Sequence, residues 1–221
     1  MNLNKCIIVI VFFLFPCKYT YSEVNISYNN TSEYDRVINH IQEKLSCDEK
    51  KAVRFYLFIN YFAEGIQTEI TYIAESAESM TIKEKKINYT ISKYFESPYS
   101  NVQVSSLSRP SIFDFSIHTY LHRLARLRSR YHYTEVKIMF EPDYLGMSSV
   151  EKISENKYEI SVAMWQMFKG YIGDTIVYSD ATRKKFRFLF DYSNQMPSVK
   201  ISEILVAETI TLDYYLNNRN R

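Results

Sequence analysis

An alternation of apolar and polar residues with a period of two runs through the second half of the chain. It is most regular where Phe186, Phe188, Phe190 and Tyr192 alternate with Lys185, Arg187, Leu189 and Asp191. Successive side chains of an extended strand point to opposite faces, so this segment predicts a strand with one apolar face. Other elements have to cover that face, and this requirement constrains the fold more than any other feature of the chain.

Further strands are predicted at residues 101–107, 134–140, 157–168 and 199–212. Gly170, Gly173 and Asp174 indicate the turn before the long strand that contains the phenylalanines. In the last strand the apolar residues change phase between Ile201 and Ile204. We interpret this change as a β-bulge at Ser202-Glu203 that bends the strand.

The first half of the chain has the period of helices instead. Helices are predicted at residues 33–45, 52–79, 82–95 and 111–130. Residues 52–79 are densely apolar at their start, which is typical of a central buried helix. Residues 46–49 and 81–84 match the capping box, in which a hydroxyl and a carboxylate satisfy free amides at a helix start. Residues 110–114 indicate the start of the last helix.

This order of elements predicts one α+β domain, with helices packed on one face of a curved sheet. The pattern resembles the NTF2-like superfamily, a cone-shaped, cystatin-like α+β fold. The resemblance covers residues 49–212 and rests on the helices AVRFYLFINYF and FDFSIHTYLHRLARL, the strand VQVSSL, and the strands that carry MWQMFKGYIGD. It implies a mainly antiparallel sheet. Residues 23–48 are then an N-terminal extension with one helix, and residues 213–221 are a polar C-terminal tail.

The N-terminus is typical of a secretory signal peptide. Lys5 precedes an apolar run over residues 6–15, which is shorter than the ~20 residues of a membrane-spanning helix. Thr20 and Ser22 predict cleavage after Ser22. Cys17 leaves a second route open, because a cysteine after an apolar run can be the lipid-modified first residue of a bacterial lipoprotein. Both routes predict an exported bacterial protein, in the periplasm, the cell envelope or the medium, with no transmembrane span in the mature chain.

Charge and cysteine content exclude several classes of protein. The chain has 27 Lys and Arg residues, of which two lie in residues 1–22, so 25 remain against 25 Asp and Glu. Binding to phosphates needs a basic excess, so no nucleic-acid partner is expected. Only Cys47 follows residue 22, which excludes an internal disulfide in the mature chain and a zinc site built on cysteine pairs. No nucleophile elbow or phosphate-binding glycine loop occurs, and no cofactor is predicted.

Residues 118–133 hold three of the four histidines. On the predicted helix, His118 and His122 lie one turn apart, opposite an apolar stripe that includes Tyr120. Their spacing suits a metal ion, but two ligands do not complete a zinc site, and Thr119 stands where zinc-protease helices have a glutamate. Arginines around the helix also disfavour a cation. We therefore predict the exposed face of a core helix and no metal site.

Three residues are candidates for lining a binding pocket: Tyr120, Trp165 and Glu203. Trp165, the only tryptophan, lies mid-strand opposite the main apolar stripe, where it either lines a pocket or interface or packs under the N-terminal helices. Glu203 lies at the predicted bulge, and the alternative for it is an ordinary surface position. Asp174 and Asp180 lack the spacing of a calcium loop and are interpreted as turn residues.

Three functions remain open at this point. The predicted inward faces of the strands are almost wholly apolar, which favours a noncatalytic binding or protein-interaction module for an unknown protein or small ligand. NTF2-like relatives also include small enzymes that use an Asp or His inside the cone, so an isomerase, dehydratase or hydrolase is the first alternative. The second is a structural component of a cell-envelope assembly, anchored at Cys17 if that residue is lipidated. Each is compatible with an oligomer.

Overall fold

The structure is a computed structural model that describes residues 31–194 and 198–219. The helices are α2 (Thr31–Leu45), α3 (Glu49–Glu75), α4 (Met80–Tyr94), α5 (Ile117–Ala125), α6 (Leu127–Tyr131) and α7 (Leu212–Asn218). The strands are β1 (Asn101–Ser106), β2 (Arg109–Ser116), β3 (Glu135–Asp143), β4 (Glu151–Ser154), β5 (Lys157–Ile172), β6 (Thr175–Asp191) and β7 (Ser198–Ile210). The predicted signal peptide, with Ser22 and Cys17, lies outside the described residues.

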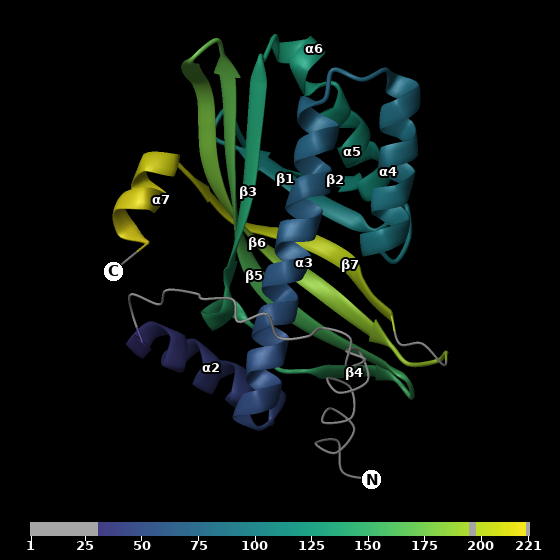
Figure 1. The fold of residues 1–221 in the computed structure, drawn as a ribbon, viewed down its shortest axis with the longest axis vertical. Coiled ribbons are helices and arrows are strands. Elements are labelled where there is room, and N and C mark those ends of the chain that lie inside the picture. The colour runs from purple at the N-terminus through teal and green to yellow at the C-terminus, as the bar shows by residue number, and fades with distance from the viewer. Residues whose placement is uncertain (1–30, 195–197, 220–221) are drawn as a thin grey trace, which may run out of the picture.

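Within the described residues, seven strands form one sheet in the order β2-β1-β7-β6-β5-β3, with β4 paired to β5. The β1–β7 pairing is parallel and the other pairings are antiparallel. The long strands β5 and β6 bend, so that the sheet curves around α3 (Figure 1). This arrangement confirms the predicted fold class, an α+β fold with helices on a curved, mainly antiparallel sheet.

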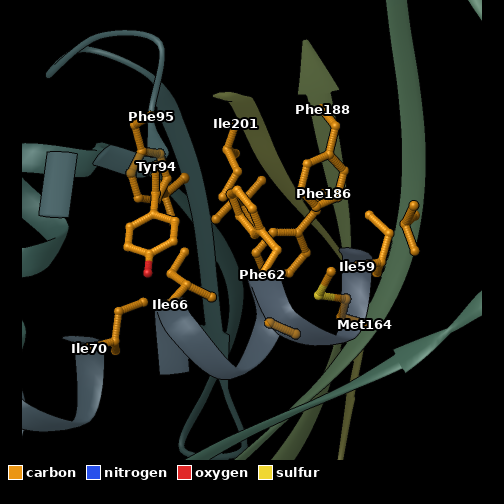
Figure 2. Close-up of a cluster of buried hydrophobic side chains, with 14 of the residues drawn as sticks. Ile59, Phe62, Ile66, Ile70, Tyr94, Phe95, Met164, Phe186, Phe188 and Ile201 are labelled. Atoms are coloured by element: carbon orange, nitrogen blue, oxygen red, sulfur yellow. The ribbon is translucent and has the colours of Figure 1, made fainter. Parts of the chain in front are cut away.

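The concave face of the sheet is covered by α3, α4 and α5, whereas α7 lies on the opposite side (Figure 1). Side chains of β6 pack against α3, where the rings of Phe188 and Phe62 lie 5.2 Å apart (Figure 2). Phe186 and Phe188 are among the largest fully buried side chains. The predicted inward orientation of the aromatic residues of this strand is therefore confirmed. No helix among the described residues is long and apolar enough to cross a membrane.

The predicted β-bulge in β7 is confirmed. Glu203 pairs with Arg187 and Ile201 pairs with Phe188, so Ser202 is the extra residue. The β6–β7 register shifts again at Ala207, because Glu208 pairs with Arg183 and Val206 with Lys184. The sequence did not predict this second irregularity.

The predicted helix at residues 111–130 is wrong in its first part. Residues 109–116 form β2, which turns back on β1 and pairs Phe115 with Val102 and Phe113 with Val104. The helix begins only after Ser116, whose hydroxyl accepts a hydrogen bond from Thr119 N at 3.2 Å. Proline is tolerated in β2 because an edge strand does not need every amide. Pairing with β1 therefore overrides the local helix-start signal.

Several smaller boundaries also differ from the predictions. α3 is capped by Asp48, which accepts from Lys51 N at 3.0 Å, and α4 begins at Met80, so neither predicted capping box forms. Ser46 instead has a left-handed φ of 50° just after α2. The predicted polar tail largely forms α7, because Leu212 and Tyr215 are buried against the sheet.

The residues interpreted as turn residues divide into two groups. Gly173, with a φ of 59°, and Asp174 do form the turn between β5 and β6. Gly170 lies inside β5, where a Cβ atom would come within 2.6 Å of the Tyr133 ring. Asp180 lies inside β6 and is buried, so its interpretation as a turn residue is wrong.

Candidate functional site

The buried face of β6 is aromatic in one half and polar in the other. The aromatic row is Phe186, Phe188 and Phe190, and the polar row, on the same face, is Tyr178, Asp180, Thr182 and Lys184. Both rows face the helices because alternate residues of a strand share a face. Lys184 is only 4% exposed and Asp180 only 6%. Two ionisable groups are therefore buried inside the cone.

Lys184 lies against Tyr120 of α5, with its ammonium nitrogen 5.4 Å from the centre of the ring, as in a cation–π contact. Burial lowers the pKa of Lys184 from 10.5 to about 8, although the charge of Asp180 acts in the opposite direction. Burial also raises the pKa of Tyr120 to about 12, partly offset by a hydrogen bond with Gln166. An amine with a pKa near 8 can exchange a proton close to neutral pH.

Asp180 is held by Tyr178, whose hydroxyl donates to the carboxylate at 2.5 Å. Burial raises the pKa of Asp180 above its usual 3.8, while the hydrogen bond from Tyr178 and the charge of Lys184 lower it. The Tyr178 hydroxyl in turn accepts from Leu107 N, in the turn between β1 and β2, at 3.2 Å. The hydroxyl that holds the carboxylate is therefore itself held by a backbone amide outside β6.

A hollow of about 210 Å³ opens where β1 and β7 diverge. The two strands pair only at Asn101 with Glu203 and at Val102 with Ile204. Beyond these pairs, the hollow is lined by Ser105, Ser106, Leu107, Ile112, Val206, Ala207, Glu208 and Thr209. The lining combines apolar side chains with hydroxyl groups and one carboxylate.

Hydroxyl groups connect this hollow to the polar row. The Thr209 hydroxyl is hydrogen bonded to that of Ser105 and lies 3.2 Å from that of Thr182. Closer to the paired end, Val206 N donates to the side-chain oxygen of Gln103 at 3.0 Å. A group bound in the hollow could therefore contact the Thr209 hydroxyl, which also lies next to Thr182 of the polar row.

The structure does not bring the three predicted pocket residues together. Tyr120 lies inside the cone beside the polar row. Trp165 lies on the opposite face of the sheet, where its ring packs 4.7 Å from that of Tyr215 under α7 rather than under the N-terminal helices. Glu203 accepts a hydrogen bond from Asn101 at 3.1 Å and forms an ion pair with Arg187 at 3.1 Å. Neither Trp165 nor Glu203 lines the hollow.

The polar row was not predicted from the sequence. The sequence predicted almost wholly apolar inward faces, and this is wrong for β6. The alternation does predict this row, because every second residue before Phe186 shares its face of the strand, and these residues are Lys184, Thr182 and Asp180. Because Asp180 was interpreted as a turn residue, this part of the strand was not recognised as facing inward.

Cys47 is free and half-buried. Burial raises the pKa of its thiol to about 11, with a smaller contribution from the charge of Asp48. The thiolate is the nucleophilic form of cysteine, and it is scarce at neutral pH at such a pKa. The surroundings of Cys47 thus favour a structural role.

A second cluster lies in the helix layer, where Glu84 of α4 meets His118 and His122 of α5. One ligand atom from each of the three residues lies within 4.8 Å of the others. The Glu84 carboxylate oxygens are 3.7 Å from Nε2 of His118 and 2.9 Å from Nε2 of His122. The sequence offered two ligands here, and the packing of α4 on α5 adds a third.

No protein-family model matches the sequence, and no curated protein matches it either. Solved structures that it resembles include the β subunit of the benzoate 1,2-dioxygenase of Burkholderia mallei, with 13% identity and a TM-score of 0.38, covering 67% of this chain and 86% of that chain. Another is a scytalone dehydratase-like protein from Novosphingobium aromaticivorans, with 8% identity and a TM-score of 0.37, covering 70% and 88%. These are NTF2-like cone folds, and the likeness concerns the fold alone.

Proposed function

We propose that the protein is a noncatalytic interaction module that binds an extended segment of a partner protein along β2, next to the hollow. The observation that carries this proposal is the exposed edge of the sheet. β2 is the terminal strand in the sheet order, and Ile112 and Phe113 in it are 49% and 46% exposed. Edge strands with apolar side chains offer backbone hydrogen bonds to an added strand and apolar contacts to its side chains.

The size of the hollow supports a protein partner over a small molecule. Pockets for drug-sized ligands usually measure about 300–1,000 Å³. The hollow beside β2, at about 210 Å³, is smaller than that range. Ile112 belongs both to the edge strand and to the lining of the hollow, so a strand added to β2 contacts a residue that borders the hollow.

A selection with displayed random peptides tests this proposal. The purified chain is expected to enrich peptides with apolar residues at alternate positions, since an added strand presents every second side chain to one face. Ile112→Lys is expected to weaken binding of the enriched peptides by roughly tenfold or more, because it places a charge in the apolar contact. Ile153→Lys is the matched control, since Ile153 is 55% exposed on β4.

Equal losses in the Ile112 and Ile153 variants would contradict binding at β2. So would a selection that enriches no peptide above background. Circular dichroism of both variants shows whether the fold is intact, so that a loss of binding can be assigned to the surface.

We also propose that the protein works outside the bacterial cytoplasm, because of the N-terminal pattern of Lys5 and the apolar run that follows it. Expression of the full chain in a bacterial host, fractionation, and mass spectrometry of the mature N-terminus test this. A chain beginning at Glu23 supports cleavage after Ser22, and a lipid-modified Cys17 supports anchoring. An intact N-terminus in the cytoplasmic fraction contradicts export.

One observation favours acid/base catalysis as the second candidate function. Lys184, with a pKa of about 8, and the buried carboxyl of Asp180 lie on the same inward face of β6. Exchange of carbon-bound protons for deuterium in a panel of small ketones, followed by NMR, tests for this activity. Exchange that disappears in Lys184→Met would support an enzyme, and exchange at the same rate in that variant would contradict this role of Lys184.

A further inference from the structure

We propose that Glu84, His118 and His122 bind a zinc ion that joins α4 to α5. The ligand types are suitable, because zinc is bound by imidazole nitrogen and by carboxylate oxygen. Imidazole is not a usual ligand of calcium or magnesium, which prefer oxygen. The proposal is independent of partner binding at β2, since it concerns residues of the helix layer.

The spacing of the donor atoms suits a tetrahedral ion. Zinc–ligand bonds of about 2.0–2.1 Å place the ligand atoms of a tetrahedral site about 3.3 Å apart. The two nitrogen–oxygen distances between the histidines and Glu84, 2.9 and 3.7 Å, lie on either side of that value. The two distances run to different oxygens of Glu84, and one ligand atom from each residue lies within 4.8 Å of the others, so the three donors must draw together around an ion.

His122 supplies a second, separate observation. Its Nε2 atom is excluded from solvent and makes no hydrogen bond, although Glu84 lies 2.9 Å away, so the carboxylate is not placed as a hydrogen-bond acceptor. Buried polar atoms are hydrogen bonded in most cases, and an exception requires an explanation such as a bound ion. The contact with Glu84 lacks hydrogen-bond geometry, and a metal at this position would use the nitrogen lone pair.

Two of the nearby arginines have partners of their own. The guanidinium group of Arg123 stacks on the ring of Phe115 at 4.5 Å. Arg128 donates to Glu75 O at 2.7 Å and to Tyr133 O at 3.3 Å. The sequence predicted that arginines disfavour a cation here. Both guanidinium groups are held by neutral partners, so their positive charge remains and opposes a bound cation.

Contacts next to the cluster hold the two helices in place. Lys83, which precedes Glu84, donates from its ammonium group to Ala125 O in the last turn of α5 at 2.9 Å. Asn88 lies one turn after Glu84 and can orient its carboxylate, because Nδ2 of Asn88 donates to Oε1 of Glu84 at 3.5 Å. A hydrogen-bond partner such as Asn88 fixes the direction of a metal-binding side chain and raises metal affinity.

Three protein ligands leave the fourth position of a tetrahedral ion open. His118 and Glu84 have side chains that are 45% and 39% exposed, so this position faces solvent. Water or a side chain from another molecule can occupy it. The ion would thus link the two helices and present a Lewis-acidic position on the surface.

A titration of the metal-free chain tests the proposal. The purified chain is treated with EDTA, dialysed, and titrated with Zn²⁺ in a calorimeter, and with Co²⁺ while the visible absorption is recorded. We expect one ion per chain, an affinity in the micromolar range or tighter, and the intense visible bands of tetrahedral cobalt. His122→Ala and Glu84→Gln are each expected to weaken zinc binding by roughly 10–100-fold or more. Glu84→Gln preserves the shape of the side chain.

His132→Asn is the matched control, because His132 is an exposed histidine outside the cluster with a left-handed φ of 58° that asparagine also tolerates. It is expected to bind zinc as the unsubstituted chain does. Binding only at millimolar zinc, or equal losses in the His132 and His122 variants, would overturn the proposal. Unchanged affinity in both His122→Ala and Glu84→Gln would do the same.

Discussion

The two rows on the buried face of β6 occupy equivalent positions of one strand and differ in chemistry. The aromatic row packs against α3, with Phe188 at 0% exposure and in ring contact with Phe62. In the polar row, Asp180, Thr182 and Lys184 are buried almost as deeply, whereas Tyr178 is half-buried. Burial stabilises the first row through the hydrophobic effect, whereas in the second it penalises the charged forms.

The aromatic row therefore contributes to the hydrophobic core, whereas the polar row contains the buried ionisable groups Asp180 and Lys184. In the polar row, burial penalises the charged forms of Asp180 and Lys184, and Thr182 contacts Thr209 at the hollow between β1 and β7. Three substitutions test how far the two rows differ, in order of expected effect.

Phe188→Ala is expected to have the largest effect. Removing a fully buried ring loses its transfer free energy and leaves a cavity, which together cost about 3–5 kcal/mol of unfolding free energy. Phe113→Ala, at a position that is 46% exposed on β2, is the control and should change stability by about 0.5 kcal/mol or less. Urea denaturation followed by circular dichroism measures both. A loss below about 1 kcal/mol for Phe188→Ala would show that the aromatic row does not hold the core.

Lys184→Met tests the polar row through its dependence on pH. The folded-state pKa of Lys184, about 8, lies below the ordinary value of 10.5, so burial of the ammonium group lowers the unfolding free energy. This destabilisation is complete below pH ~8, where Lys184 is protonated in both the folded and the unfolded state. The cost is relieved as the pH rises from 8 towards 10.5, because the folded state then loses its proton more readily than the unfolded state. The unfolding free energy should therefore rise by about 2 kcal/mol between pH ~7 and ~10, relative to Lys184→Met.

Denaturant curves of the unsubstituted chain and the variant at several pH values measure this difference. At neutral pH the variant should be at least as stable, because a buried charge is replaced by an apolar side chain of similar length. Parallel pH profiles for the two proteins would mean that Lys184 keeps an ordinary pKa, and the contrast between the rows would then be weaker than the structure indicates.

Tyr178→Phe should have the smallest effect of the three. It removes the hydroxyl that donates to Asp180 and accepts from Leu107 N, which costs about 1–2 kcal/mol because the carboxylate stays buried without this donor. Tyr99→Phe, at a side chain that is 84% exposed, is the matched control. Thermal unfolding of both variants compares the two sites. Equal melting temperatures would mean that solvent replaces the lost hydrogen bonds and that the polar row is wetter than its burial suggests.

The regular alternation in β5 and β6 was enough to predict these strands and the inward orientation of Phe186 and Phe188, but not the polar half of the inward face of β6. The phase change in β7 also predicted the bulge at Ser202, because a bulge changes which side chains share a face. Residues 109–116 were not predictable in the same way. Their local signals favour a helix start, and only pairing with β1 makes them a strand.

The sites depended on tertiary contacts to different degrees. The polar row could have been found in the sequence by continuing the alternation from Phe186 back to Asp180. The histidine cluster could not, because Glu84 and His118 are far apart in sequence and meet only when α4 packs on α5. The surroundings of Trp165 were also not predictable from the sequence, because its partner Tyr215 lies in a segment that was predicted to be a polar tail.

By itself, the sequence determined the α+β class, the long strands and the apolar face that the helices cover. These follow from the period of hydrophobic residues, which is a local property of the chain. The tertiary structure decided which edge strand stays exposed, that Asp180 and Lys184 are buried, and that Glu84 joins His118 and His122. Each of these depends on contacts between segments distant in sequence, and a local pattern carries no information on which distant segments meet.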